Sequence, residues 1–337
     1  MRRPARALAV AAALLATAIG LRGQQAGPAP EAYPGVLDEH PAIQYERRVT
    51  TDRVAKLAKE VAAGTRTLAR DGRSGYLRAV LEALDVPVAS QVLIFSKTAL
   101  QRAYVSPSNP RALFYSDSVV VGYIHGAPQL EIAVHDPQQG VVFYTLDQQA
   151  APAFSRNVGC LTCHVSAATL EVPGMLVRSN RVYPDGTPIP RLGFSVVNHA
   201  TPHPERWGGW FVTSTAVTPP PYQPLGHLGN LVTELAPGSE RPIVSDETLV
   251  RWRDVDFAGL GYPSPRSDIG NLMVFDHQMH AINLITRTRS RTSAVAIGSR
   301  LPLAATRASQ LIRVIRLIAC IWWSKTIRLP MSLRGDG

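Results

Sequence analysis

Cysteine is scarce in this chain of 337 residues, which contains only three. Cys160 and Cys163 stand in one short motif, and Cys320 lies alone far downstream, so a framework of several disulfides is excluded. The sequence also lacks an internal repeat and the alternation of strands and helices that builds a parallel sheet. Repeat architectures and doubly wound α/β folds are therefore not expected.

Acidic residues are scarce at both ends of the chain, and this decides what the net charge of +10 means. From Arg287 onward there are nine Arg, one Lys and one Asp, and the first 25 residues add four Arg. The net positive charge of these two ends exceeds that of the whole chain, so the body between them is slightly acidic. The basic composition therefore does not indicate that the folded body binds nucleic acid.

The first hydrophobic run is too short for a comfortable membrane crossing. It follows Arg2, Arg3 and Arg6 and covers about 14 residues up to Gly20, whereas a spanning helix needs roughly 20. This layout predicts a signal peptide over residues 1–25, and an uncleaved anchor is the alternative. Either interpretation places the body outside the cytoplasm, in the periplasm or otherwise exported.

Residues 26–90 form a leader and a helical segment. After a stretch rich in Pro and Gly, Asp52 to Leu84 has the spacing of an amphipathic helix, and Gly72 to Gly75 separates it from a second helix that ends near Asp85. The residues expected on one face of the first helix are Val54, Leu57, Ala58, Val61 and Ala62.

Residues 91–150 change to short β-like runs separated by turn signals such as SPSNP and DPQQG. The runs are 91–95, 112–115, 119–124, 130–134 and 141–146. They predict an antiparallel β module after the helices, and thus an α+β fold that ends in a loop-rich region over residues 151–287. Within that region, 207–215 is the best strand candidate and 271–287 is expected to be helical.

Cys160-Leu161-Thr162-Cys163-His164 is a CxxCH motif, the attachment signature of c-type haem. Two thiols three positions apart on a helical turn can add to the two vinyl groups on one side of a porphyrin, and the adjacent His faces the iron. A zinc half-site and a redox dithiol are the alternatives, because CxxC alone supports both. Zinc would need a second Cys or His pair, and a thioredoxin-like site would need a βαβ unit; the sequence shows neither.

The sixth iron position separates electron transfer from catalysis, since a strong second ligand closes the site. Met175, in Val-Pro-Gly-Met, is the first thioether after His164 and is the predicted ligand; a Met packed in the core is the alternative. Histidines that could instead reach iron are His199, His203, His227, His277 and His280, with His125 and His135 as weaker candidates.

Four arginines follow the motif, and one or two of them are expected to hold the haem propionates. They are Arg178, Arg181, Arg191 and Arg206. Trp207 and Trp210, on either side of two glycines, are expected to wall the haem or fill the core.

Seven segments in series carry a resemblance to a known family. They are FSKTALQ (95–101), SPSNPRALFYSDSVVVGYIHG (106–126), DPQQGVVFYTLDQ (136–148), GCLTCH (159–164), VPGMLVRS (172–179), PERWGGWFVTS (204–214) and HLGN (227–230). Over about 91–287 the chain resembles exported bacterial proteins described as cytochrome c domain-containing, which have one CxxCH and no assigned reaction. The resemblance implies haem binding with electron-transfer or oxidoreductase chemistry, and only Cys160, Cys163 and His164 are carried over.

The sequence departs from that pattern at Arg287. Residues 288–337 are rich in Arg and Ser with one acid. One interpretation is a cationic helix on a membrane surface, since 311–329 mixes aliphatic residues and two Trp with basic ones. The other is a tail translated out of the ancestral reading frame.

The sequence thus predicts an exported protein with a single haem c that transfers electrons to a partner protein. A peroxidase-like or other small-molecule oxidoreductase with an open sixth iron position is the first alternative, and His199, His227 or His280 could then act as the distal acid-base group. A sensor or structural subunit is the second.

Overall fold

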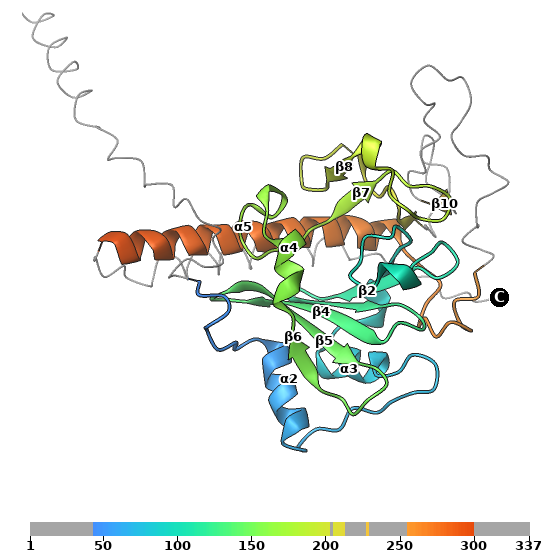
Figure 1. The fold of residues 1–337 in the computed structure, drawn as a ribbon, viewed down its shortest axis with the longest axis horizontal. Coiled ribbons are helices and arrows are strands. Elements are labelled where there is room, and N and C mark those ends of the chain that lie inside the picture. Colours follow the sequence, from blue (N-terminus) through green and yellow to red (C-terminus); the bar gives the residue numbers. More distant parts are fainter. Residues whose placement is uncertain (1–42, 203–204, 213–226, 229–254, 300–337) are drawn as a thin grey trace, which may run out of the picture. The chain divides into compact units, whose positions relative to one another are not determined.

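The computed structural model describes residues 43–202, 205–212, 227–228 and 255–299. These ranges contain helices and a six-stranded antiparallel sheet, so the α+β class is confirmed. Figure 1 shows the elements in chain order by colour. The helices are α2 (Arg53–Ala62), α3 (Leu77–Ala83), α4 (Leu161–His164) and α5 (Ile269–Ser299).

The main sheet is a meander in which each strand pairs with the next along the chain, β1-β2-β3-β4-β5-β6. Its strands are β1 (Val92–Ile94), β2 (Arg111–Tyr115), β3 (Val119–Tyr123), β4 (Gln129–Asp136), β5 (Gly140–Asp147) and β6 (Phe154–Arg156). The five predicted β runs correspond to β1 through β5. Short turns between neighbouring runs favour this topology, because antiparallel strands can be joined by tight connections.

Two small sheets and five single turns complete the described part. The two-stranded sheets pair β7 (Arg178–Asn180) with β8 (Phe194–Val196) and β9 (Phe211–Val212) with β10 (His227–Leu228). The 3-10 turns are η1 (Val88–Ser90), η2 (Arg102–Tyr104), η3 (Val158–Cys160), η4 (Ala167–Thr169) and η5 (Pro190–Leu192). Of the strand predicted over 207–215, only β9 is confirmed, because 207–209 form a turn in which Trp207 has φ +62°; 213–215 lie outside the described residues.

The sheet is covered by helices on both faces (Figure 1). On the α2–α3 face, apolar side chains of β4 such as Leu130 and Ile132 join one core with Leu57 and Leu81. On the α5 face, side chains from the alternate positions of the strands meet Leu272, Phe275, Met279 and Ile282 of α5 in a second core. This two-sided burial follows from the strand period of two, which sends successive side chains to opposite faces.

The first predicted helix is shorter than its sequence pattern indicates. The Asp52 carboxylate caps α2 by accepting from the Ala55 N–H at 2.8 Å. The helix ends at Ala62, because Gly64 has φ +70° and the Thr65 N–H donates back to the Glu60 carbonyl at 3.0 Å. This is a glycine-terminated Schellman ending. The prediction that the helix continues to the break at Gly72 is wrong.

The predicted helix over 271–287 is confirmed as part of α5, which continues past Arg287 to Ser299. The sequence boundary at Arg287 is therefore not the end of a helix. Thr286 and Ser290 are buried, and the Ser290 hydroxyl donates to the Thr286 carbonyl at 2.9 Å. Within the described ranges, no helix is both long and apolar enough to span a membrane.

Candidate functional site

The CxxCH residues occupy one tight helical segment that follows β6. The Asn157 side chain accepts from the Gly159 N–H at 3.0 Å and starts η3, which leads directly into α4. Cys160 is half-buried and Cys163 is exposed, and the two thiols are not joined in a disulfide. The motif thus presents two free thiols and one imidazole within five residues.

The imidazole of His164 is held in one orientation. Its Nδ1 lies 2.9 Å from the Gly174 carbonyl oxygen, and its ring centroid lies 4.5 Å from that of Phe143 on β5. A carbonyl only accepts, so Nδ1 carries the proton and Nε2 keeps its lone pair. Burial, together with the charges of Arg111 and Arg178, lowers the pKa of His164 to about 4. The ring is therefore neutral at physiological pH and able to bind a metal through Nε2.

The Val-Pro-Gly-Met segment reaches His164 because α5 fixes its backbone. The Asn283 side chain accepts from the Met175 N–H and donates to the Met175 carbonyl, both at 2.7 Å. A Cβ on Gly174 would lie 2.5 Å from Asn283 Oδ1, so only glycine fits there. The Pro173 carbonyl accepts from the Val141 N–H at 2.9 Å, which ties the segment to β5. Met175 itself is 6% exposed.

A cavity of about 310 Å³ lies between the motif and the α5 face of the sheet. This volume is at the lower end of the range of small-molecule sites, roughly 300–1,000 Å³. Side chains from the sheet, the motif, the segment after it and α5 surround the cavity. They include Ile94, Leu113, Val120, Phe143, Cys160, Cys163, His164, Met175, Arg178, Trp210, Phe275 and Met279.

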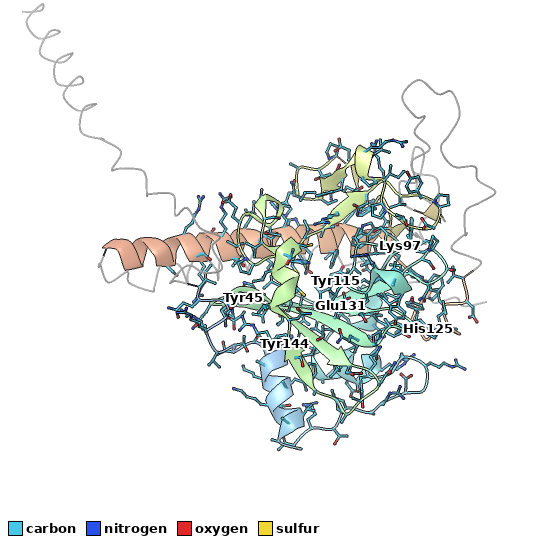
Figure 2. The ribbon with its side chains drawn as sticks, in the orientation of Figure 1. Tyr45, Lys97, Tyr115, His125, Glu131 and Tyr144 are labelled. Carbon is cyan, nitrogen blue, oxygen red and sulfur yellow. The ribbon has the colours of Figure 1, made fainter. Side chains whose placement is uncertain are left out.

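An ion pair on the sheet lies in the floor of this cavity. Arg111 on β2 reaches across Gly122 to Glu131 on β4, which is labelled in Figure 2. A Cβ on Gly122 would lie 2.9 Å from the Arg111 guanidinium, so this glycine makes room for the side chain. Gln101 donates to the same carboxylate at 3.1 Å. Burial, and then the negative charge of Glu131, raise the pKa of the Cys160 thiol to about 11.

Arg178 lies at another part of the cavity wall. Its guanidinium carbon is 4.6 Å from the centre of the Phe194 ring. Its Nε atom is buried and has no hydrogen-bond partner among the described residues, as is also the case for Arg111. Of the four arginines predicted to hold propionates, Arg178 is therefore placed at the cavity, whereas Arg181, Arg191 and Arg206 are not among the lining residues.

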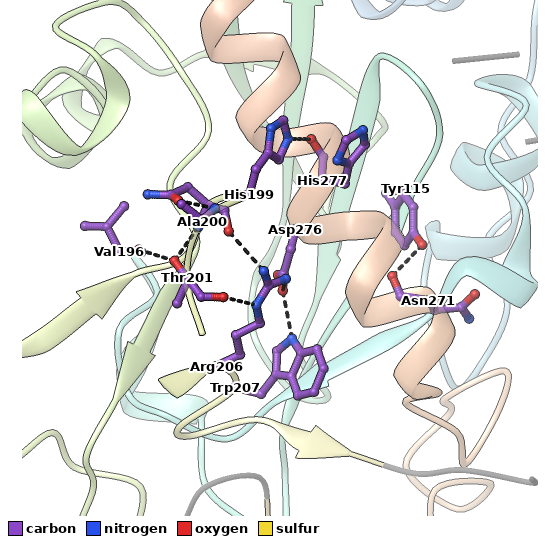
Figure 3. A network of polar contacts seen from close by, with 11 residues as sticks. Tyr115, Val196, His199, Ala200, Thr201, Arg206, Trp207, Asn271, Asp276 and His277 are labelled. Atoms are coloured by element: carbon purple, nitrogen blue, oxygen red, sulfur yellow. Dashed lines mark hydrogen bonds and ion pairs between the residues drawn. The ribbon is translucent and has the colours of Figure 1, made fainter. Parts of the chain in front are cut away.

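The Arg-Trp-Gly-Gly-Trp turn contacts α5 through Arg206 and Trp207, whose side chains both reach Asp276 (Figure 3). Trp207 donates through Nε1 to Asp276 Oδ2 at 2.9 Å, and Arg206 lies 3.5 Å from the same oxygen. The Trp207 backbone has φ +62°, and a Cβ on Gly208 would lie 2.5 Å from the Asn180 carbonyl oxygen. Burial raises the pKa of Asp276 to about 7, against the lowering effects of Trp207 and Arg206. Trp207 therefore fills the core, and Trp210 lines the cavity.

Three of the candidate histidines gather away from the cavity. The His199 ring stacks on His277 at 4.2 Å and meets the edge of His280 at 4.5 Å, and its Nε2 bonds the His277 carbonyl oxygen at 3.1 Å. His164 is the only histidine that lines the cavity within the described ranges. His203 and the His227 side chain lie outside the described residues.

Four residues described above belong to no recognisable sequence motif and are not predicted from the sequence: Arg111, Glu131, Asp276 and Asn283. Asp276 and Asn283 interrupt the apolar stripe of a helix, and a polar residue in such a stripe is the signal that could have found them. Arg111 and Glu131 stand in half-buried strands, where alternation alone does not distinguish a paired charge from a solvated one.

Among the described residues, no group of three or more His, Cys, Asp or Glu side chains is arranged to hold a metal ion. A metal ion that is already held within a ligand needs only one imidazole from the protein. A group of three protein ligands is then not required. Comparison with models of protein families, with curated proteins and with solved structures finds no match for this chain.

Proposed function

We propose that this chain is an exported protein that carries one covalently attached haem c and transfers electrons through it. The orientation of His164 is the observation that carries the proposal. A neutral imidazole whose Nδ1 donates to the Gly174 carbonyl at 2.9 Å presents Nε2 as a metal ligand. The same helical segment places two free thiols beside that ring. A bound haem would supply an iron that gains and loses one electron.

The thiols have the chemistry that haem attachment needs. Addition of an S–H group across a vinyl C=C bond forms one C–S and one C–H bond, so it consumes no oxidant or reductant. The raised pKa of Cys160 keeps that thiol protonated at neutral pH. Because no disulfide joins Cys160 to Cys163, both sulfur atoms are available for this addition.

The charge of the cavity fits a ligand with two carboxylates. Its lining contains three arginines, Arg102, Arg111 and Arg178, and one acid, Glu131. The excess of two positive charges equals the two negative charges of the haem propionates. Arginine guanidinium groups are suited to bind carboxylates, and Arg102, Arg111 and Arg178 all line the cavity.

Electron transfer is favoured over the peroxidase-like alternative by what surrounds the cavity. A catalytic haem needs a distal acid-base group, and His199 and His280, two of the predicted candidates, are not among the described residues that line the cavity. Thioethers, which close the sixth iron position, do line the cavity. The signal-peptide pattern of residues 1–25 supports export, and a redox partner protein is then expected. Membrane contact through the basic residues 288–337 stays a prediction.

Covalent attachment is tested by expressing the full chain with a c-type haem maturation system and denaturing the purified protein in acidified organic solvent. We expect the pigment to stay with the polypeptide. The double variant Cys160→Ala/Cys163→Ala is expected to be colourless or to release all its pigment, whereas the control Cys320→Ala should keep it. A colourless wild-type protein, or complete extraction of its pigment, contradicts the proposal.

A further inference from the structure

Two thioethers line the same cavity as His164, and they reach it from different elements. Met175 belongs to the segment that contacts the His164 ring, and Met279 belongs to α5. Both are buried, with exposed fractions of 6% and 1%. Among the described lining residues, these two sulfur atoms are the candidates for a second strong iron ligand, since His164 is the only histidine there.

The position of the Met175 backbone is set by its neighbour Gly174. The Gly174 carbonyl oxygen lies 2.9 Å from His164 Nδ1, and Met175 is joined directly to that carbonyl carbon. Nδ1 and Nε2 of an imidazole are separated by one ring carbon and point in widely divergent directions. The Met175 backbone therefore lies behind the ring as seen from any metal bound to Nε2.

The Met175 main chain is held in this position, because its N–H and its carbonyl group both bond the Asn283 side chain at 2.7 Å. A ligand opposite His164 must approach from the far side of the porphyrin plane. To reach it, the Met175 side chain would have to pass around both the imidazole and the porphyrin. The geometry that orients His164 thus separates Met175 from the sixth iron position.

The main chain of Met279 takes no part in these bonds to Asn283. Met279 is four residues before Asn283 and four after Phe275 on α5, so the three side chains lie on one side of the helix. Phe275 packs edge-on against Tyr115 at 5.1 Å and lies 5.9 Å from Trp210, a cavity residue. Contacts at both neighbouring turns therefore hold the Met279 thioether at the cavity.

We infer that Met279 of α5, rather than Met175, supplies the sulfur ligand opposite His164. This inference rests on the proposed function, because it assumes a haem bound by the CxxCH motif. It assigns α5 a direct part in the site and makes the helix an element that tunes the redox potential. A thioether ligand favours the ferrous state and raises the potential.

The test compares three Met→Leu variants of the full chain, purified with haem attached. Leu is close to Met in volume, so each variant should fold. Met279→Leu is expected to lose the weak charge-transfer band of a thioether–iron(III) bond, to become high-spin and to fall in redox potential. Met175→Leu should keep the band. Met273→Leu is the matched control, since Met273 is on the same helix and 49% exposed. Met279→His should restore a low-spin spectrum without the band.

Several outcomes overturn the inference. A wild-type protein that is high-spin in the ferric state has no sixth protein ligand. Loss of the band in Met175→Leu, with the band kept in Met279→Leu, assigns the ligand to Met175. These results are distinguishable from failure of the proposed function, because in that case no covalent pigment is present in any variant.

Discussion

The two faces of the main sheet differ in what they bury, although the same strands build both. On the α2–α3 face the core consists mainly of apolar side chains, with Leu130, Ile132 and Val134 of β4 directed into it, and its buried Asp52 carboxylate accepts from the Tyr144 hydroxyl. On the α5 face the alternate positions of β4 bring Glu131 and Ala133 to the cavity. A closely packed apolar core stabilises a fold. A face that keeps a cavity and an ion pair is packed less closely and leaves space for a ligand. Under the proposed function, the α2–α3 face supports the fold and the α5 face holds the haem.

Matched Leu→Ala substitutions on the two faces test this difference, and they should give the largest effects. Leu130 is fully buried in the apolar core, so Leu130→Ala is expected to lower the free energy of unfolding by about 3–5 kcal/mol. Leu113 adjoins the existing cavity, so Leu113→Ala should cost less, about 2 kcal/mol. Chemical denaturation measures both. Equal losses would show that the two faces are packed alike.

A pH series should sharpen the comparison, because burial raises the pKa of a carboxyl group on each side, Asp52 beside α2 and Asp276 on α5, and the pKa of Asp276 reaches about 7. The pKa of Asp276 is about 7 in the folded protein and 3.8 in the unfolded reference. Between these values the folded state holds a proton that the unfolded state has lost, so the contribution of Asp276 to stability is greatest below pH 4 and falls as pH rises to about 7. The fall from this one group is at most about 4 kcal/mol.

The corresponding variant is Asp276→Asn, measured by denaturation at several pH values between 4 and 8. We expect a flatter dependence of the unfolding free energy on pH than in the wild type. A dependence that is unchanged in Asp276→Asn would show that other groups cause it.

Of the three tests, breaking the ion pair between Arg111 and Glu131 in the cavity wall should change the free energy of unfolding least. Glu131→Gln leaves the partly buried Arg111 without its counter-charge, and we expect a loss of about 1–3 kcal/mol at neutral pH. It also removes one of the causes that raise the Cys160 pKa, so the thiol of the haem-free protein should be alkylated faster at alkaline pH. An unchanged alkylation rate would mean that Glu131 does not act on this thiol.

The helices and strands of the described part could be predicted largely because they depend on local patterns. Runs rich in β-branched and aromatic residues in 119–124 and 141–146 predict β3 and β5, and the turn residues between runs predict that neighbours pair. The error at α2 has a local cause as well, because Gly64 ends the helix where apolar spacing alone would continue it. Local chemistry thus accounts for both the success and the miss.

The candidate site could be predicted only where its residues are close in sequence. CxxCH is a motif of five residues, so Cys160, Cys163 and His164 are identified without a structure. The contact between Met175 and Asn283 joins positions 108 apart, and the pair between Arg111 and Glu131 depends on how three strands align. Such contacts arise from tertiary packing, which no spacing rule encodes.

The Asn283 amide has a mechanical consequence for the whole site. One side chain holds both main-chain groups of Met175, and the adjoining Gly174 carbonyl orients the His164 ring. A rotation of α5 about its axis therefore turns the imidazole as well, through a chain of three hydrogen bonds. The orientation of the one imidazole that lines the cavity in the described part of the chain therefore depends on the position of α5.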